Sequence, residues 1–417
     1  MIVKTFGSCV VGIDAIPITI EVSVEQGISF YLVGLPDSAV KESQQRIATA
    51  LSCYGFRIPG KKIIINMAPA DLRKEGAAYD LPIAIGILAA SEQIASENLS
   101  DYIIMGELSL DGDLKPIRGV LPIAVEAKKQ GFKGLILPQA NVSEASIVSG
   151  LEVYGAENII QVIGFFNGSP LEQAKVAAPE QLAEGLNQFE LDFSEVKGQE
   201  NAKRALEIAA AGGHNVIMIG SPGSGKTMLA QRISSILPPM TLEEALETTK
   251  IHSVAGKLQS QVPLIMTRPF RSPHHTISDV ALVGGGTHPQ PGEISLAHNG
   301  ILFLDELPEF KRSVLEVMRQ PLEERRVTIS RSKMSVEFPA SFMFIAAMNP
   351  CPCGYYNHPD KKCSCQPGQI RHYMSKISGP LLDRIDLHVE IIPVPFSELS
   401  QKKQGESSAV VRERVIR

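Results

Sequence analysis

The sequence lacks the features of a membrane or secreted protein. Its first residues show no basic segment followed by an apolar stretch, so no secretory signal peptide is expected. Its most apolar stretch, residues 81–90, is too short to cross a bilayer and contains Pro82. We therefore expect no membrane partner and a cytoplasmic location.

The sequence also lacks a net positive charge and contains few cysteines. The formal net charge is −5, so a nucleic-acid partner would have to meet a local basic patch and not a field over the whole surface. Six cysteines in 417 residues are too few for a disulfide scaffold. Four of them crowd between residues 351 and 365, which points to a metal site instead.

What the sequence does contain is typical of a globular protein with two domains, since 417 residues are many for one core. Residues 1–165 mix strand and helix patterns and predict an α+β domain, and residues 166–190 read as a linker. In the first domain we predict strands at 18–24 and 62–66, and helices at 37–54 (capped by Asp37), 79–90 and 121–130.

A glycine-rich loop organises the second domain, residues 191–395. An apolar run at 215–219 predicts a buried parallel strand, and a helical pattern over 228–237 ends at two prolines. Between them the sequence fits G-x-x-x-x-G-K-[ST], the phosphate-binding loop (P-loop), and a chance glycine-rich turn is the alternative. Such a loop holds phosphates with backbone N–H groups and a lysine, and its Ser or Thr binds Mg²⁺, so we expect a nucleoside triphosphate such as ATP with Mg²⁺. The P-loop residues are Gly220, Ser221, Pro222, Gly223, Ser224, Gly225, Lys226 and Thr227.

Two later apolar runs end in polar residues suited to hydrolysis. Residues 301–304 predict a strand followed by Asp305 and Glu306. We expect Asp305 to support the magnesium ion and Glu306 to polarise the attacking water. Residues 341–348 predict another buried strand, followed by Asn349. Asn349 either helps to position that water or simply begins an Asn-Pro turn.

The order of these motifs resembles the AAA+ ATPases, and two segments narrow the resemblance. Arg-Pro-Phe-Arg-Ser-Pro-His-His-Thr-Ile-Ser at 268–278 and Gly-Glu-Ile-Ser-Leu-Ala-His-Asn-Gly at 292–300 are similar to the magnesium-chelatase branch. The resemblance implies an α/β ATPase core with a parallel sheet and flanking helices. It also implies that Asn349 is the residue known as sensor 1.

Two further roles follow from the AAA+ resemblance. The run at 192–199 would line an adenine pocket with Val196 and Gln199, whereas the alternative is a helix N-cap at Ser194. Arg384, in the run 379–387, would be an arginine finger that reaches the γ-phosphate of a neighbouring subunit. A surface ion pair of Arg384 with Asp383 or Asp386 is the alternative.

The first domain resembles the Lon-type protease domain, which has a ribosomal S5 domain 2-like fold. The resemblance rests on residues 106–119, 127–131 and 135–138. The nucleophilic serine of that family falls at Ala78 or a neighbour, and its partner lysine falls near Leu121. A methyl group cannot be acylated, so we expect no peptidase activity and a role in scaffolding, subunit packing or DNA contact.

Together the two domains resemble the ComM/YifB-type Mg-chelatase-like ATPases over essentially the whole chain. The family implies a hexameric ring that drives DNA branch migration in natural transformation, acting on single-stranded or branched DNA beside recombination proteins. The main alternative is the motor subunit of a magnesium chelatase, which the Lon-like domain and the cysteine loop disfavour. A non-enzymatic interaction protein is disfavoured by the intact nucleotide motifs. In this family a helical lid follows the ATPase core, and the lid carries a second sensor arginine. We expect residues 396–417 to be the beginning of this lid, without that arginine.

Residues 325–338 alternate in the manner of a β-hairpin, with Arg331 and Lys333 at its tip. Residues 311–333 hold seven Lys/Arg against three Glu. In the related MCM helicases the corresponding hairpin grips DNA in a central pore, so these two residues are predicted DNA contacts. A solvated charged hairpin is the alternative.

The cysteines form two C-x-C pairs in a turn-rich loop directly after Asn349. Four thiolates from two tight turns suit tetrahedral zinc, and the alternative is reduced free thiols. The predicted zinc ligands are Cys351, Cys353, Cys363 and Cys365, with His358 and His372 as spare ligands.

Overall fold

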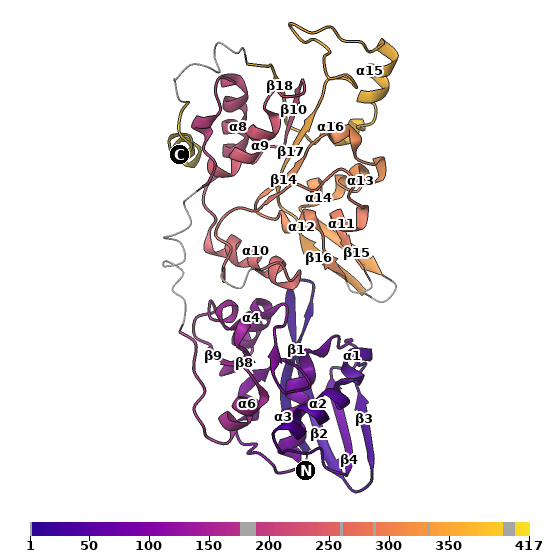
Figure 1. Cartoon of the computed structure of the whole chain (residues 1–417), viewed down its shortest axis with the longest axis vertical. Coiled ribbons are helices and arrows are strands. Elements are labelled where there is room, and N and C mark those ends of the chain that lie inside the picture. The colour runs from indigo at the N-terminus through magenta and orange to yellow at the C-terminus, as the bar shows by residue number, and fades with distance from the viewer. Residues whose placement is uncertain (1, 176–188, 259–261, 287–288, 332–333, 395–404) are drawn as a thin grey trace. The chain divides into compact units, whose positions relative to one another are not determined.

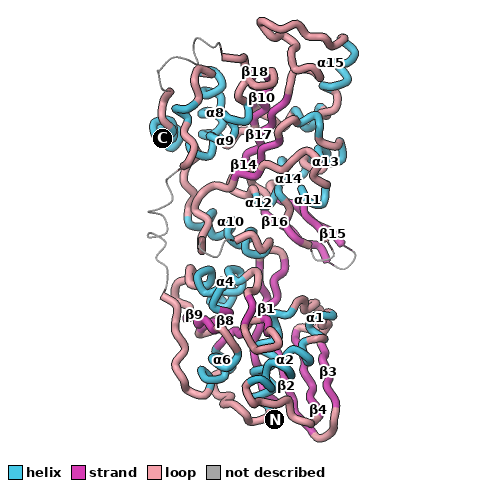
Figure 2. The backbone as a smooth tube through the Cα atoms, viewed as in Figure 1, coloured by secondary structure: helices cyan, strands magenta, loops and turns pink. Residues whose placement is uncertain are grey.

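The structure is a computed structural model that describes residues 2–175, 189–258, 262–286, 289–331, 334–394 and 405–417. Figures 1 and 2 show its helices and strands. Internal contacts divide the chain into two units, the first Met1–Leu182 with His252–Leu264 and the second Ala183–Ile251 with Ile265–Arg417. Much of the predicted linker (176–188) and the start of the predicted lid (396–404) lie outside the described residues.

The first unit is built on a seven-stranded mixed sheet in the order β3-β4-β2-β1-β5-β8-β9. Strands β1, β2 and β4 pair antiparallel, and the remaining neighbours pair parallel. The sheet confirms the strands predicted at 18–24 and 62–66. The strands are β1 (Ile2–Val11), β2 (Asp14–Glu25), β3 (Ser29–Val33), β4 (Lys62–Ala68), β5 (Tyr102–Ile104), β8 (Gly134–Pro138) and β9 (Glu152–Ala156), beside a small ribbon of β6 (Glu107–Leu108) and β7 (Leu114–Lys115).

The helices of this unit largely follow the apolar patterns of the sequence. They are α1 (Ser38–Lys41), α2 (Ser43–Cys53), α3 (Asp80–Ala90), α4 (Val120–Lys129), α5 (Val142–Ala145) and α6 (Ile159–Phe166). Every residue of α3 is buried, which explains its lack of a polar face. The single helix predicted at 37–54 is wrong, because the chain breaks at Glu42 into α1 and α2. Asp37 does cap α1, accepting a hydrogen bond from the Val40 N–H at 2.8 Å.

A buried ion pair joins two of these helices. The side chain of Asp80, at the start of α3, is 1% exposed. Its carboxylate accepts two hydrogen bonds from Arg46 of α2, at 2.7 Å from Nε and 2.9 Å from Nη2. Burial raises the pKa of Asp80, and the Arg46 guanidinium opposes that rise. Composition and periodicity gave no sign of this pair.

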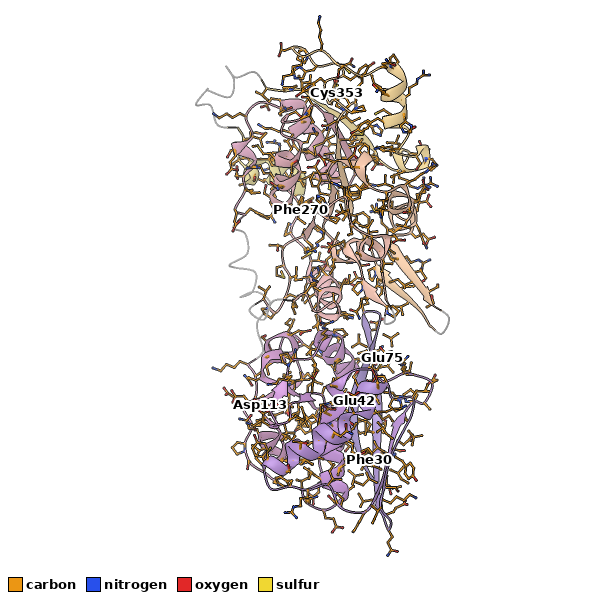
Figure 3. All side chains as sticks on the ribbon, turned by 45° about the vertical axis from the view of Figure 1, so that its right-hand side comes forward. Phe30, Glu42, Glu75, Asp113, Phe270 and Cys353 are labelled. Atoms are coloured by element: carbon orange, nitrogen blue, oxygen red, sulfur yellow. The ribbon has the colours of Figure 1, made fainter. Side chains whose placement is uncertain are left out.

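The second unit is built on a five-stranded sheet in the order β11-β14-β17-β10-β18, and all neighbouring strands are parallel. The order confirms the predicted α/β class and the strands at 215–219, 301–304 and 341–348. These strands are β10 (Val216–Gly220), β11 (Phe270–Arg271), β14 (Ile301–Leu304), β17 (Met343–Met348) and β18 (Leu387–Ile391). Phe270, labelled in Figure 3, lies against Phe303 of the adjacent β14, with ring centroids 6.0 Å apart.

Two antiparallel ribbons accompany this sheet: β12 (Gly284–Gly285) with β13 (Gln290–Pro291), and β15 (Arg326–Arg331) with β16 (Met334–Pro339). The second ribbon confirms the predicted hairpin. The helices are α8 (Glu200–Gly212), α9 (Lys226–Arg232), α10 (Leu242–Val254), α11 (Asp279–Val283), α12 (Glu293–Leu296), α13 (Arg312–Glu316), α14 (Arg319–Glu324), α15 (Pro367–Met374), α16 (Gly379–Leu382) and α18 (Ser408–Ile416).

The last helix belongs to the core of the second unit. Val411 and Val415 of α18 are buried in its apolar cluster, and Arg414 pairs with Glu207 of α8 at 2.7 Å. The Ser408 hydroxyl accepts a hydrogen bond from the Phe193 N–H at 2.8 Å. The segment predicted to begin a lid therefore packs, over 408–416, against the helices beside β10. Among the described residues, none of the helices has the length and apolarity needed to cross a membrane.

Candidate nucleotide site

The predicted nucleotide residues meet at one edge of the five-stranded sheet. Strand β17 lies between β10 and β14, and the three run parallel, so their carboxyl ends share an edge. The P-loop follows β10, Asp305 and Glu306 follow β14, and Asn349 follows β17. Ligands of open α/β sheets bind at this edge, beyond the carboxyl ends of the strands.

The P-loop conformation depends on its glycines. Gly223 and Gly225 have φ of +78° and +94°, the left-handed region that glycine adopts without strain. A Cβ on Gly220 would lie 2.4 Å from the carbonyl oxygen of Ile391 in β18, so only glycine fits there. Helix α9 then begins at Lys226, which places its N-terminus at the loop.

Lys226 spans the loop and reaches the end of β17. Its Nζ donates to the carbonyl oxygens of Gly220 and Ser221 at 2.7 and 3.0 Å, and to Oδ1 of Asn349 at 3.3 Å. Burial lowers the pKa of Lys226, and the nearby carboxylates Asp305 and Glu306 oppose that change. The lysine thus joins the P-loop directly to the predicted sensor.

The residues present fit Mg²⁺ and phosphate. The Thr227 hydroxyl donates to Oδ2 of Asp305 at 2.7 Å, so the two predicted Mg²⁺ ligands are adjacent oxygen donors of the kind that this ion prefers. The Ser221 and Ser224 hydroxyls are buried and have no hydrogen-bond partner among the described residues. Phosphate oxygens at the loop would provide such partners.

Glu306 has an unusual backbone conformation. Its φ is +51°, in the left-handed region, and its N–H donates to Oδ1 of Asp305 at 2.9 Å. Its side chain is 58% exposed, and its Oε2 lies 3.7 Å from Nδ1 of His275. Sequence reasoning missed this contact, although His275 stands within the chelatase-like segment 268–278.

The segment predicted to hold adenine lies against the P-loop. Nε2 of Gln199 donates to the carbonyl oxygens of Ser224 and Ile392 at 3.2 and 2.6 Å, so Gln199 braces the loop. Val196 is buried in the core of the unit. The alternative of a cap at Ser194 is wrong, because Asp192 caps the short turn and accepts from the Ser194 N–H.

Arg384, the predicted arginine finger, lies two residues after α16, which ends at Leu382. Its guanidinium pairs with Glu323 of α14 in the same chain, and its side chain is 29% exposed. Neither Asp383 nor Asp386 is its partner among the described residues; Asp386 accepts from the Asn215 N–H at 2.8 Å instead. The structure therefore corrects only the alternative, because the intrachain partner of Arg384 is Glu323 and neither Asp383 nor Asp386; the role of Arg384 as an arginine finger stays a prediction.

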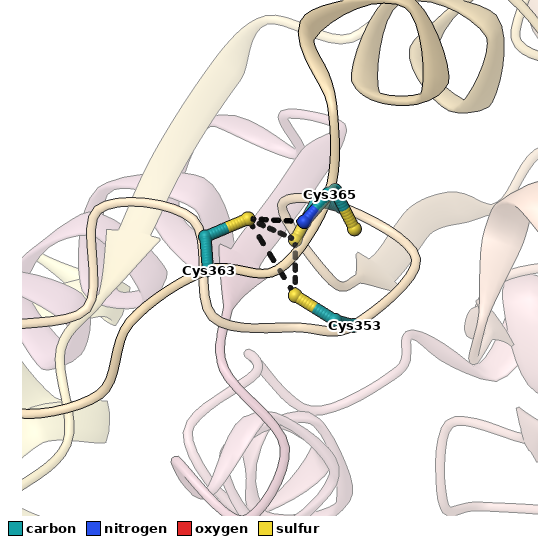
Figure 4. A group of neighbouring side chains, drawn as sticks. Cys353, Cys363 and Cys365 are labelled. Carbon is teal, nitrogen blue, oxygen red and sulfur yellow. Dashed lines mark hydrogen bonds between the residues drawn. The ribbon is translucent and has the colours of Figure 1, made fainter.

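The four cysteines converge, as Figure 4 shows for Cys353 and Cys363. The sulfur of Cys351 lies 3.4 Å from that of Cys353 and 3.7 Å from that of Cys363, and all four lie within 4.8 Å of one another. Four sulfurs bound tetrahedrally to one zinc ion would lie about 3.8 Å apart, whereas a disulfide would bring two to about 2.05 Å. The spacing fits the metal.

The environment of the cluster favours a thiolate at Cys353. Hydrogen bonds from the backbones of Tyr355 and Ser364 lower the pKa of Cys353 to about 5. At Cys363 a backbone hydrogen bond from Cys365 lowers the pKa, but burial and the neighbouring thiols Cys353 and Cys351 outweigh it and raise that pKa to about 12. The predicted spare ligands His358 and His372 stand outside the group, and Nδ1 of His358 instead accepts from the Asp360 N–H at 3.0 Å. All four cysteines therefore remain the candidate ligands.

The cysteine loop also touches the P-loop. A Cβ on Gly354 would lie 2.5 Å from Cδ of Pro222, so the two loops pack closely at this point. A cavity of about 420 Å³ lies beside the contact, lined by Gly220 and Ser221 and by residues 356–359 and 388–393. The cysteine loop is thus in a position to support the phosphate-binding loop.

Of the two predicted DNA residues, Arg331 is the last residue of β15. Strands β15 and β16 pair from Arg326 opposite Pro339 to Arg331 opposite Met334. Lys333 and the side chain of Arg331 lie outside the described residues. At the base of the hairpin, Arg326 pairs with Glu324 and Glu337.

In the first unit, the positions aligned with the Lon dyad carry apolar side chains. Ala77 and Ala78 form a 3₁₀ turn before α3, and the Ala78 carbonyl accepts from the Gly106 N–H at 2.9 Å. Leu121 is fully buried in α4. Neither position offers a nucleophile or a base.

Comparisons with known proteins agree with this two-part structure. A family model described as magnesium chelatase, subunit ChlI, matches residues 192–399, and one described as subunit ChlI of Mg-chelatase matches residues 20–141. The chain is 47% identical to competence protein ComM of Haemophilus influenzae, over 97% of this chain and 80% of that protein. It is also 47% identical to the uncharacterized protein YifB of Salmonella typhimurium, over 97% of this chain and 79% of that protein.

A partial match concerns the Lon-like fold. Lon protease 2 of Bacillus subtilis is 30% identical over 30% of this chain and 22% of that protein. The matches to ComM and YifB, in contrast, run through both units. With a Lon-like domain ahead of a parallel α/β ATPase domain, the chain belongs to the ComM/YifB family of Mg-chelatase-like AAA+ ATPases.

Proposed function

We propose that this protein is an ATP-driven motor that moves along DNA and promotes branch migration during natural transformation. The observation that carries the proposal is that the P-loop, Asp305, Glu306 and Asn349 meet at one edge of the sheet, and that β17, the strand before Asn349, directly follows a hairpin. Strand β16 ends at Pro339, β17 runs from Met343 to Met348, and Asn349 then contacts Lys226. The similarity to a competence protein supports a role with incoming DNA.

Each residue of the site has a separate role in this proposal. The P-loop N–H groups and Lys226 bind the phosphates, and Thr227 and Asp305 would hold Mg²⁺, which neutralises phosphate charge when bound. Glu306 accepts the proton of the attacking water. Asn349 helps to position that water, since its amide already lies beside the lysine.

Hydrolysis is completed between subunits in this proposal. Arg384 contacts the γ-phosphate of a neighbouring subunit, so the active species is a ring, six-fold by family resemblance. The ring places the hairpins around a pore, where Arg331 and Lys333 contact DNA phosphates. Contacts of this kind carry no sequence information, so binding should be sequence-independent and weaken as salt rises.

Zinc is the metal proposed for the cysteine loop. Four sulfur ligands in tetrahedral spacing form a closed site with no open position for a reactant. The ion would therefore have a structural role. It would stiffen the loop that begins two residues after Asn349 and packs on Pro222.

A second candidate function is the motor of a magnesium-chelatase-like complex. Both family models carry the description of subunit ChlI, and one of them matches the first unit. The Lon-like first domain is therefore weaker evidence against a chelatase motor than the sequence alone indicated. The DNA motor is favoured because the match to competence protein ComM covers 97% of the chain.

The decisive experiment measures ATP hydrolysis with and without single-stranded and forked DNA, and then strand exchange on a synthetic branched junction. We expect DNA to stimulate hydrolysis and the protein to migrate the branch. The double variant Arg331→Ala/Lys333→Ala should keep basal hydrolysis and lose both effects of DNA. Arg326→Ala is the matched control, since Arg326 lies at the hairpin base in ion pairs with Glu324 and Glu337. A rate of ATP hydrolysis that DNA does not change would favour the chelatase motor. Branch migration at the wild-type rate by the double variant would show that the hairpin tip, Arg331 and Lys333, does not grip DNA.

A further inference from the structure

The contact between His275 and Glu306 joins the proposed general base to the segment 268–278, which has no role in the mechanism proposed above. His275 lies on the segment between β11 and α11, and Nδ1 is 3.7 Å from Oε2 of Glu306. At this distance the two groups are neighbours but do not share a direct hydrogen bond. Catalytic hydrogen bonds are often long in a nucleotide-free site and shorten when substrate binds.

The segment that carries His275 is held at two points. Arg268 donates to the carbonyl oxygens of Pro238 and Asn299 at 2.8 and 2.7 Å. Arg271 forms a bidentate pair with Glu293 of α12, at 2.6 and 2.8 Å. Bidentate arginine pairs fix orientation as well as distance, so the loop that follows β11 has a defined position.

The His275 ring itself is supported by its neighbours. It stacks on His274 with centroids 4.0 Å apart, and it meets Phe310 edge-on at 6.3 Å. His274 is oriented in turn by Thr276, whose hydroxyl lies 3.0 Å from Nδ1 of His274. Phe310 is 4% exposed and follows the short turn that begins at Glu306. The buried Phe310 ring is therefore connected to Glu306 through this turn and contacts the His275 ring directly.

Glu306 needs such a partner because little else orients its side chain. It is 58% exposed and stands on a left-handed residue at the end of β14. Lys226, the other nearby cation, donates to the P-loop carbonyls and to Asn349. An imidazole N–H that holds one carboxylate oxygen leaves the other free to accept a proton from water.

We propose that His275 is a positioning residue that orients the Glu306 carboxylate for ATP hydrolysis. The proposal rests on the proposed function, because it assumes that Glu306 is the general base. It also gives the segment 268–278 a role in catalysis, because a shift of this loop changes the direction of the base and thereby the rate of hydrolysis. His275 touches neither the P-loop nor the Mg²⁺ ligands among its described contacts, so nucleotide affinity should not depend on it.

The test compares two replacements of His275 in the whole protein. His275→Phe keeps a ring between His274 and Phe310 but cannot donate a hydrogen bond. His275→Asn places an amide N–H near the position of Nδ1. We expect the His275→Phe variant to have a kcat lower by on the order of tenfold, with little change in KM. This loss is smaller than the roughly 10²–10⁴-fold rate enhancement that general acid–base catalysis supplies, because the base itself is still present. Asn should restore most of kcat.

Two further measurements separate positioning from folding. Thermal unfolding and nucleotide binding should match the unchanged protein in both variants. In the Glu306→Gln background, His275→Phe should cost nothing more, because the two residues act as one unit. Equal losses of kcat in the His275→Phe and His275→Asn variants, or full kcat in the His275→Phe variant, would overturn the proposal without affecting the proposed ATPase activity. No hydrolysis by the unchanged protein would instead overturn the proposed function, and this inference with it.

Discussion

In the proposed mechanism, Lys226 and Glu306 act at different stages of the reaction, because they contact different parts of the site. Lys226 lies within the P-loop, so Lys226→Ala should abolish nucleotide binding. Glu306 is outside the loop, so Glu306→Gln should still bind ATP but stall turnover, since an amide cannot accept the proton. Fluorescent-nucleotide titration and phosphate release measure the two steps. Glu309→Gln, on the same turn and paired with Lys376, is the matched control, and normal turnover by Glu306→Gln would remove Glu306 from its role.

At the same scale, the pair of Arg46 and Asp80 should contribute measurably to the free energy of unfolding of the first unit. Arg46→Met leaves a carboxylate that is 1% exposed without its cation. Breaking a buried pair in this way costs about 3–5 kcal/mol of unfolding free energy. Denaturant unfolding of the whole protein should show an earlier transition, and Asp80→Asn in the same chain should recover part of the loss. The exposed Arg57→Met is the control; an equal effect there would show that the ion pair is not the cause.

The elements that could be predicted from the sequence are those fixed by local pattern. The P-loop, its strand and its helix were found because glycine turns and an apolar strand are short-range signals. The break at Glu42 was missed because α1 and α2 together keep one helical periodicity. Two site contacts were beyond prediction, that of His275 with Glu306 and that of Gly354 with Pro222, because each joins segments brought together only by the sheet order.

The cysteine loop is the element whose stability should control nucleotide binding. Elemental analysis should find about one zinc per chain if the four thiolates share one ion. Cys351→Ser should lose that zinc and weaken nucleotide binding, because Gly354 packs on Pro222 of the P-loop. Cys53→Ser, an exposed cysteine of the first unit, is the control. A zinc-free protein with full activity would contradict the assignment.

For the whole molecule, the position of Arg384 bears on how subunits depend on one another. In the single chain its guanidinium pairs with Glu323, and its Nε is buried without a hydrogen-bond partner among the described residues. A finger that serves a neighbour must exchange the Glu323 carboxylate for a γ-phosphate. A γ-phosphate carries more negative charge than the Glu323 carboxylate, and this difference would favour the exchange when a nucleotide-filled neighbour is present.

This exchange predicts complementation between two inactive variants. Lys226→Ala lacks a working P-loop but keeps its finger, whereas Arg384→Ala keeps the P-loop and lacks the finger. Each alone should hydrolyse ATP at background rate, because every interface then lacks one component. Mixed before assembly, the two should recover part of the wild-type activity, since some interfaces pair an intact P-loop with an intact finger. The control mixes Lys226→Ala with Glu306→Gln/Arg384→Ala, in which no interface is complete. If the first mixture stays as inactive as the control although the subunits co-assemble, Arg384 does not act across the interface.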